Sequence, residues 1–448
     1  MSLQVAVVGS GPSGMYAADA LLDAGATVDV FDRLPVPFGL VRYGVAPDHL
    51  SIRSVRNTLD QIWDRAGVRF VGNVDVGTDI SIEELRAGYD AVVLTYGASA
   101  DRRLGIEGED LAHSVAATDF VAWYTGHPQY VGPDFGEILP QVRSVAVIGV
   151  GNVAVDVVRV LSKSPEELAH TDMPEHVLST LAAAPVRSVH LVGRRGPAQA
   201  SFTTKELKEL GELADADVHV YPADLETDSF SAQTLAESKI ATRNVSVLRE
   251  WADRDARTDV TTNIHLHFFS RPLQILGSQQ VERLVLERTE FAADGTLVDT
   301  GEQQVLDVDL VVRSVGYRGK PVPGVPFDAE RGVIPHEQGR VLDQGNAVPG
   351  LYVAGWIKRG PTGIIGTNKK CAVQTVGALI EDVAAGSVTA GSHAGVDVVQ
   401  MLMDRGTAVV DIAGWRAIDG AEQERGGADG KERVTVHEHE ELLRLARG

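Results

Sequence analysis

Two glycine-rich turns are the segments whose residue types and spacing indicate chemistry. The first, Gly9-Ser-Gly11-Pro-Ser13-Gly14, directly follows the apolar run Val5 to Val8. The second, Gly149-Val-Gly151-Asn152-Val153-Ala154, follows the apolar run Val145 to Ile148. Such a turn between a buried strand and a helix lets the backbone approach a pyrophosphate, which the helix N-terminus then binds. Each turn therefore predicts a dinucleotide site, and the alternative is a glycine turn without a ligand.

The surrounding residues predict the elements that position the two turns. A helical pattern follows each turn, at Met15 to Ala24 and at Val155 to Leu161. Each half later carries an apolar strand that ends in glycine, at Ala91 to Gly97 and at Leu310 to Gly316. A further strand at 350–356 precedes a helix expected from Asn368 to about Val383. We expect an α/β fold with two Rossmann-like domains, the second inserted into a discontinuous first.

The residues that end the second strand of each unit differ in charge. In the first unit this strand ends at Asp32, whose carboxylate suits ribose hydroxyls and repels a 2′-phosphate. The first site is therefore expected to bind FAD or NAD. In the second unit Ser188 to Val192 leads to Arg194 and Arg195, whose guanidinium groups suit the 2′-phosphate of NADPH. The alternative is a pair of solvated arginines.

Two further segments point to a flavin. The loop from Leu34 to His49 is rich in proline and glycine but too apolar for a solvated loop, so we expect it to line the flavin ring. Gly363 to Thr367 is expected to form a backbone platform, with the dipole of the following helix stabilising negative charge on the reduced ring. A plain helix-entry turn is the alternative for this second segment.

Composition excludes several classes of protein. The formal charge is −21, from 62 acidic and 41 basic residues, which argues against nucleic acid or an anionic membrane as the main partner. The single cysteine, Cys371, excludes an intrachain disulfide, a CxxC redox pair and a cysteine-ligated cluster. We expect no metal site, and we expect His437-Glu438-His439 to be solvated surface.

Location and the C-terminal tail are also predicted. No targeting segment precedes the first strand, and no apolar run is long enough to span a membrane, so we expect a cytoplasmic protein. The Gly- and Glu-rich stretch from Asp419 to Lys431 is expected to be exposed.

Four stretches together resemble one known family. They are Val36-Pro-Phe-Gly-Leu-Val-Arg-Tyr-Gly-Val-Ala-Pro-Asp-His49, Gly149-Val-Gly-Asn-Val-Ala-Val-Asp156, Val192-Gly-Arg-Arg-Gly-Pro197 and Gly355-Trp-Ile-Lys-Arg-Gly-Pro-Thr-Gly363. These are similar to the adrenodoxin-reductase family of ferredoxin–NADP⁺ reductases, above all its bacterial members. The resemblance implies a monomer with an FAD domain at 1–103 and 325–448, and an NADPH domain at 104–324.

The resemblance also implies roles for individual residues. Besides the glycines of the first turn, the implied FAD contacts are Ser13, Asp32, Leu40, Val76, Trp356, Gly363, Ile364 and Ile365. The implied NADPH contacts are Gly151, Asn152, Val153, Arg194, Arg195 and Glu206, with Arg102 and Gly363 at further NADPH positions. His49 and Asp156 match a polar pair near the electron path, to which we assign a tuning role.

The activity implied is transfer of hydride from NADPH to FAD, then of single electrons to a ferredoxin-type iron–sulfur protein. Lys239, Arg243, Arg249, Arg254 and Arg257 are candidates for a basic docking patch, with solvated charges as the alternative. Two other functions stay open. One is an NADPH-dependent flavin oxidase or monooxygenase-like enzyme that reduces oxygen or small molecules, and the other is a non-catalytic redox sensor.

Overall fold

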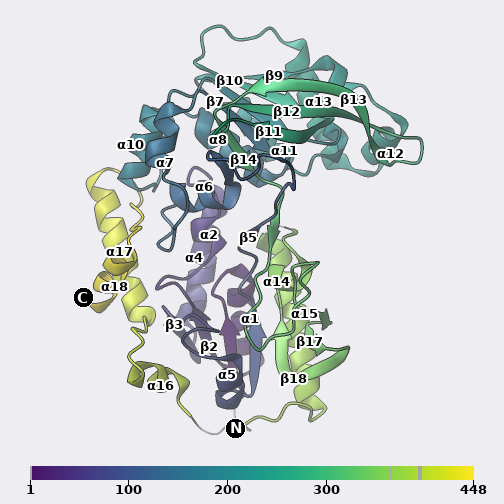
Figure 1. Cartoon of the computed structure of the whole chain (residues 1–448). Coiled ribbons are helices and arrows are strands. Elements are labelled where there is room, and N and C mark those ends of the chain that lie inside the picture. The colour runs from purple at the N-terminus through teal and green to yellow at the C-terminus, as the bar shows by residue number, and fades with distance from the viewer. Residues whose placement is uncertain (1–2, 364, 392–395) are drawn as a thin grey trace. The chain divides into compact units, whose positions relative to one another are not determined.

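The computed structural model describes residues 3–363, 365–391 and 396–448 (Figure 1). The chain forms two compact units. The first comprises Met1–Ala100, Thr125–Gln129 and Gly316–Gly448, and the second comprises Asp101–Tyr124 and Tyr130–Val315. The second unit interrupts the first in sequence, so the first is discontinuous, as predicted.

The first unit is built on a sheet in the order β16-β17-β18-β4-β1-β2-β3. Its strands are β1 (Gln4–Val8), β2 (Thr27–Asp32), β3 (Val68–Gly72), β4 (Ala91–Leu94), β16 (His336–Glu337), β17 (Arg340–Asp343) and β18 (Asn346–Val353). The strands from β18 to β3 are parallel, and β16 and β17 extend the sheet antiparallel. Because β18 pairs with β4, residues from both ends of the chain complete one sheet.

Helices cover both faces of this sheet. They are α1 (Pro12–Asp23), α2 (Leu40–Tyr43), α3 (Leu50–Arg53), α4 (Val55–Asp60), α5 (Ile82–Gly88), α14 (Trp356–Arg359), α15 (Ile365–Ala384), α16 (Val398–Asp404), α17 (Ile412–Ala428) and α18 (His439–Arg447), with the 3₁₀ turn η1 (Gln61–Asp64). Alternate residues of the central strands enter separate cores on the two faces, since Val5 and Val7 lie in one and Ala6 and Val8 in the other. This two-sided burial explains why the strand reads as a continuous apolar run.

Two expectations for the C-terminal part need correction. α15 begins at Ile365, not at Asn368, so Thr367 belongs to the helix and not to a preceding loop. The stretch from Asp419 to Lys431 is not simply exposed, because most of it lies in α17 and Glu422 is fully buried. Arg42 and Arg433 pair with this carboxylate, which allows a charged residue to leave water.

The second unit is built on a wholly parallel sheet in the order β6-β14-β7-β8-β10-β9. Its strands are β6 (Ser114–Ala116), β7 (Ser144–Ile148), β8 (Ser188–Val192), β9 (Ala216–Val220), β10 (Thr262–His267) and β14 (Leu310–Arg313). A three-stranded antiparallel sheet joins it, made of β11 (Ser270–Leu276), β12 (Arg283–Phe291) and β13 (Leu297–Asp307). Short strands β5 (Ala100–Asp101) and β15 (Tyr317–Arg318) lie where the chain changes units.

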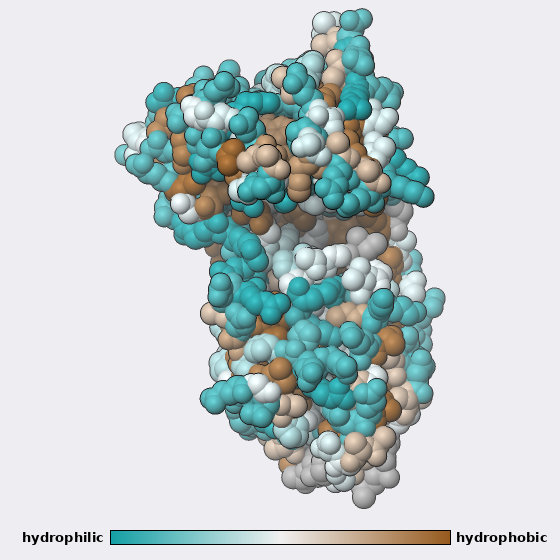
Figure 2. Space-filling view, turned by 90° about the vertical axis from the view of Figure 1, so that its right-hand side faces the viewer, coloured by the Kyte–Doolittle hydropathy of each residue, from teal (hydrophilic) through white to brown (hydrophobic). Residues whose placement is uncertain are grey.

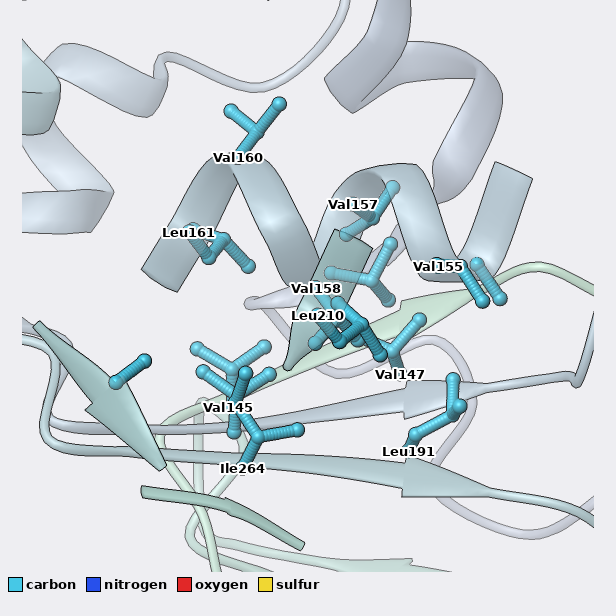
Figure 3. Packing of buried hydrophobic residues seen from close by; sticks show 14 of the residues in the cluster. Val145, Val147, Val155, Val157, Val158, Val160, Leu161, Leu191, Leu210 and Ile264 are labelled. Carbon is cyan, nitrogen blue, oxygen red and sulfur yellow. The ribbon is translucent and has the colours of Figure 1, made fainter. Parts of the chain in front are cut away.

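The helices of the second unit are α6 (Ala117–Tyr124), α7 (Phe135–Ile138), α8 (Asn152–Ser162), α9 (Pro165–Leu168), α10 (Glu175–Ala183), α11 (Thr204–Leu210), α12 (Ser229–Glu237) and α13 (Lys239–Asp253), with 3₁₀ turns η2 (Leu139–Gln141), η3 (Pro197–Gln199) and η4 (Pro222–Leu225). Val158 of α8 and Leu210 of α11 lie over Val145 and Val147 of β7 (Figure 3). Fully burying a side chain of this size stabilises the fold by about 1.5–3 kcal/mol. This packing fixes α8 on the strand that precedes its glycine turn.

Both units thus have the parallel α/β architecture of Rossmann-type domains, as predicted. On the face shown in Figure 2, hydrophilic residues cover much of the surface, with smaller hydrophobic areas among them. Within the described ranges, no helix is both long enough and apolar enough to cross a membrane.

Candidate functional site

The first glycine turn leaves an open space at the N-terminus of α1. Gly9 has φ +107°, and a Cβ added there would lie 2.8 Å from the Cα of Tyr96. A Cβ on Gly14 would lie 1.8 Å from the Gly9 carbonyl oxygen. A Cβ on Gly11, the N-cap of α1, would meet no described atom within 4 Å. The outer glycines are thus required by close packing, and the middle one borders space that a pyrophosphate can occupy.

Asp32 ends β2 beside this turn. One of its carboxylate oxygens accepts a hydrogen bond from the backbone N–H of Ser10 at 2.8 Å, and the other accepts one from Leu34 at 3.0 Å. Burial raises the pKa of Asp32, and the hydrogen bonds from Ser10 and Leu34 oppose this rise. The bonds hold the half-buried carboxylate in place, where it can accept a hydrogen bond from a ribose hydroxyl.

Two predicted FAD contacts have buried polar atoms without a partner among the described residues. They are the hydroxyl of Ser13, in the first turn of α1, and the indole N–H of Trp356, at the start of α14. A Cβ on Gly355 would lie 2.7 Å from the Ser13 hydroxyl, so the turn after β18 touches α1. A buried polar group left unpaired costs about 1–3 kcal/mol. A bound dinucleotide would offer the missing partners, so these residues fit FAD.

The loop predicted to line the flavin folds back onto the same turn. Phe38, with φ +82°, donates its N–H to the Ser10 carbonyl at 3.1 Å. A Cβ on Gly39 would lie 3.1 Å from the Cα of Gly11. The adjacent Leu40 is 40% exposed, which is unusual for a leucine in a segment that is otherwise mostly buried. The loop therefore presents apolar surface next to the glycine turn.

The remaining predicted residues of the first unit are placed as follows. Val76 and His49 are buried, and Gly363 has φ +84° just before α15 begins at Ile365. Ile364 lies outside the described residues. The N-terminus of a 20-residue helix carries a partial positive charge, which is available to an anionic group near Ile365.

The second glycine turn repeats the construction of the first. Gly149 has φ +131°, and a Cβ there would lie 2.1 Å from the Ser314 carbonyl oxygen. Gly151 is the N-cap of α8, so the first backbone N–H groups of this helix have no partner within it. The side-chain carbonyl of Asn152 accepts the N–H of Thr203 at 2.8 Å, which ties the start of α8 to the start of α11. Gly151, Asn152 and Val153 can therefore offer backbone donors to a phosphate.

Arg194 and Arg195 lie in the exposed turn after β8. Their carbonyl groups accept hydrogen bonds from the Thr289 hydroxyl at 2.7 Å and the Phe269 N–H at 3.1 Å. In the described part of the chain, neither guanidinium has a carboxylate within ion-pair distance. The backbone is thus fixed while two positive charges stay available for an anion.

A pocket of about 310 Å³ borders this pair, lined by Arg194, Arg195, Arg271, Leu297 and Asp299. Sequence reasoning missed Arg271, which lies on β11. Its guanidinium contacts Asp299 at 2.8 Å and Glu287 at 2.6 Å. No local pattern marks this residue, because only the packing of the antiparallel sheet brings it to the arginine pair.

Asp156 and Glu206 meet in one buried charge cluster within the second unit. Arg159, which is 1% exposed, contacts Asp156 at 2.8 Å and both Glu206 and Glu209 at 3.4 Å. The sequence had assigned Asp156 and Glu206 to separate roles. Arg102 is exposed in this unit, whereas His49 belongs to the first unit, so its pairing with Asp156 stays a prediction.

The five candidate docking cations do not form one patch of free charge. Arg254 pairs with Asp217 at 2.6 Å, and Arg257 donates to the carbonyl groups of Leu213, Ala214 and Ala216. These two arginines therefore hold their own unit together. Lys239 and Arg243 are exposed on α13.

Comparison with known proteins identifies the relatives of this chain. Residues 3–209 match the family model described as pyridine nucleotide-disulphide oxidoreductase. NADPH-ferredoxin reductase FprA of Mycobacterium tuberculosis is 44% identical over 99% of this chain and 99% of its own. NADPH:adrenodoxin oxidoreductase, mitochondrial, of Arabidopsis thaliana is 39% identical over 99% of this chain and 95% of its own.

Solved structures agree with these sequence relationships. The structure of Mycobacterium tuberculosis FprA in complex with NADPH superposes with a TM-score of 0.92 at 43% identity, and the match covers 100% of both chains. The similarity thus extends over both units and both glycine turns. The chain belongs to the adrenodoxin-reductase-like family of ferredoxin–NADP⁺ reductases.

Proposed function

We propose that this chain is an NADPH-dependent FAD flavoprotein that takes hydride from NADPH and passes electrons singly to a small ferredoxin-type iron–sulfur protein. The observation that carries this proposal is the opposite chemistry beside its two nucleotide turns. Asp32 accompanies the first, and Arg194 and Arg195 accompany the second. A carboxylate suits a ribose without a phosphate, whereas two unpaired guanidinium groups suit a 2′-phosphate. One chain that holds both dinucleotides can pass a hydride between them.

The FAD domain in this proposal comprises 1–103 and 325–448. Gly9, Gly11 and Gly14 admit the pyrophosphate, Asp32 accepts from the ribose, and the unpaired donors of Ser13 and Trp356 support the assignment. Leu40, Val76 and the segment Gly363 to Ile365 complete the proposed set. When bound, the flavin ring accepts a hydride and releases electrons one at a time.

The NADPH domain in this proposal comprises 104–324. Gly151, Asn152 and Val153 bind the pyrophosphate through backbone N–H groups, and Arg194 and Arg195 bind the 2′-phosphate. Glu206, Arg102 and Gly363 are proposed as further contacts. Positioning and electrostatics carry the rate of hydride transfer, so His49 and Asp156 tune the site and do not act as an acid–base pair.

The test is anaerobic stopped-flow absorbance of the purified protein with NADPH or NADH. Rapid loss of the oxidised-flavin band, more efficient with NADPH, is the expected result. Ferredoxin should then restore the band. Reoxidation by oxygen that ferredoxin does not accelerate would favour the oxidase alternative, and a band indifferent to both coenzymes would refute the reductase.

The assignment of Arg194 and Arg195 is tested by replacing both with alanine. Two lost charge-assisted hydrogen-bonding groups, at about 1.5–3 kcal/mol each, should raise the KM for NADPH at least 100-fold. The KM for NADH should change little, because NADH lacks the 2′-phosphate. Equal losses for both coenzymes would contradict the assignment. We also propose that the enzyme works as a monomer in the cytoplasm, without a membrane or nucleic-acid partner.

A further inference from the structure

A cluster of four histidines lies on one face of the parallel sheet of the second unit. His190 of β8, His265 of β10 and His219 of β9 stand in one row, since their strands pair in register at these residues. The ring centroids of His190 and His265 are 5.0 Å apart, and those of His219 and His265 are 4.9 Å apart. His267, two residues beyond His265, faces the same side, with its ring 5.2 Å from His190. The reductase function uses none of these rings.

Hydrogen bonds orient the rings of His190 and His267 toward each other. Nε2 of His190 lies 3.0 Å from the Ser188 hydroxyl, which leaves Nδ1 facing Nε2 of His267 at 2.9 Å. The ring of Tyr221 lies 5.2 Å from His267, and its hydroxyl is 3.2 Å from Nδ1 of His265. Two ring nitrogens on neighbouring strands of one sheet therefore face one another at 2.9 Å.

Burial lowers the pKa of three of the four histidines. Burial, and then the neighbouring histidines, lower the pKa of His190 to about 3, and burial likewise lowers the pKa values of His265 and His267 to about 4. The nearest carboxylate to the cluster in the described structure is Asp217, 3.8 Å from Nε2 of His219 at its far end. Neutral imidazole is the form that binds a metal ion.

We propose that Nδ1 of His190 and Nε2 of His267 chelate a divalent transition-metal ion of the Zn²⁺ class, with water completing its coordination. Imidazole nitrogens prefer such ions to Mg²⁺ or Ca²⁺. At the usual Zn–N distance of about 2.0–2.1 Å in tetrahedral geometry, the two nitrogens must move a few tenths of an ångström apart. Both rings must also turn so that their lone pairs converge on the ion, and the proton between the two nitrogens must move to the other nitrogen of its ring. The Ser188 hydroxyl then supports the ring of His190 from outside, as partners of metal-binding histidines commonly do.

The ion would join β8 to β10 just before the turn that carries Arg194 and Arg195 and just before β11, which carries Arg271. Beyond the two histidines, Gly193 donates to the His267 carbonyl at 2.8 Å, and Phe269 donates to the Arg195 carbonyl at 3.1 Å. A metal ion that cross-links these strands should therefore stabilise the turn that carries Arg194 and Arg195. Metal binding can be tested separately from catalysis, because it is measured without coenzyme.

The test is isothermal titration of the chelator-treated, FAD-loaded full chain with ZnCl₂ at neutral pH, with MgCl₂ as the comparison ion. One Zn²⁺ per chain should bind, and MgCl₂ should give no comparable heat. His190→Gln and His267→Gln should each weaken Zn²⁺ binding by more than the 10–100-fold typical of losing a supporting residue. His170→Gln, which changes an exposed histidine of the same unit, should leave the affinity unchanged.

Zinc X-ray absorption on the wild-type chain makes the test independent of how the variants fold. Two imidazole ligands per bound zinc are expected. An all-oxygen coordination sphere, no binding, or binding that both glutamine variants retain at full strength would each overturn the proposal. If the glutamine variants lose zinc binding but NADPH still reduces their flavin normally, the proposed reductase function stands.

Discussion

Replacing Glu422 by glutamine should destabilise the first unit far more than replacing an exposed glutamate. Glu422 lies on α17 with its side chain 0% exposed, and it pairs with Arg42 of α2, which is 2% exposed. One carboxylate oxygen also accepts the N–H of Val436 at 2.9 Å, and the other lies 3.3 Å from Arg433. The carboxylate thus compensates two buried cations.

The magnitude follows from what the substitution leaves behind. Arg433 keeps Asp419 at 2.7 Å, but Arg42 has no other carboxylate partner in the described structure. Breaking a buried ion pair on one side costs about 3–5 kcal/mol, because the remaining charge stays in a poorly solvated place. The matched control is Glu432→Gln, since Glu432 is 65% exposed and pairs with Arg56. An exposed pair contributes about 0.2–1 kcal/mol.

The assay is urea unfolding of the FAD-loaded chain, followed by the rise in flavin fluorescence as FAD is released. This signal reports the first unit, where we place FAD. We expect Glu422→Gln to lower its free energy of unfolding by about 3–5 kcal/mol, and Glu432→Gln by less than about 1 kcal/mol. Equal, small effects of the two substitutions would show that the buried pair does not anchor α17.

The substitution should also weaken FAD binding. α17 contacts the loop that we propose to line the flavin a second time, since the rings of Trp415 and Phe38 lie edge to face with centroids 5.8 Å apart. When Arg42 loses its partner, the loop loses one of these two anchors. A Glu422→Gln protein with reduced stability but wild-type FAD affinity would mean that the loop is positioned without α17.

Four other substitutions test the nucleotide sites and one partly buried acid. Gly11→Ala should preserve the fold but reduce FAD retention, because the added Cβ enters the open space beside the turn. Gly14→Ala should unfold the first unit, because its Cβ would lie 1.8 Å from a carbonyl oxygen. Thermal melting and the FAD-to-protein ratio distinguish the two outcomes. Arg271→Gln should raise the KM for NADPH about tenfold, because the loss of one contact costs about 1.4 kcal/mol, and it should change the KM for NADH little. Equal changes in the two KM values would assign Arg271 to folding alone. Burial raises the pKa of Asp101 from 3.8 to about 6, against the opposing charge of Arg313. A raised folded-state pKa stabilises the second unit below about pH 4, and this contribution is lost as the pH rises through about 6. Urea midpoints should therefore decline across this window, and Asp101→Asn should flatten the decline; an unchanged slope would contradict the argument.

The sequence by itself determined the parts whose chemistry is local. A glycine turn, the strand before it and the helix after it are contiguous, so the turns at Gly9 and Gly149 were readable from a dozen residues each. The end of the next strand belongs to the same short strand–turn–helix–strand segment. Asp32 at the end of β2 and Arg194 just after β8 could therefore be assigned opposite roles from the sequence. The discontinuity of the first unit followed because no third nucleotide turn precedes the C-terminal strand.

Only the tertiary structure decided which distant residues share a site. Arg271 reaches the arginine pair through an antiparallel sheet that carries no nucleotide pattern, and His190 meets His267 because β8 and β10 are neighbours in space. Glu422 shows the same limit, since its charged, glycine-rich surroundings predicted exposure. The cost of burying a carboxylate depends on its partners, and Arg42 lies 380 positions away along the chain. Local sequence encodes backbone geometry, but charge compensation is a property of residues that meet only after folding.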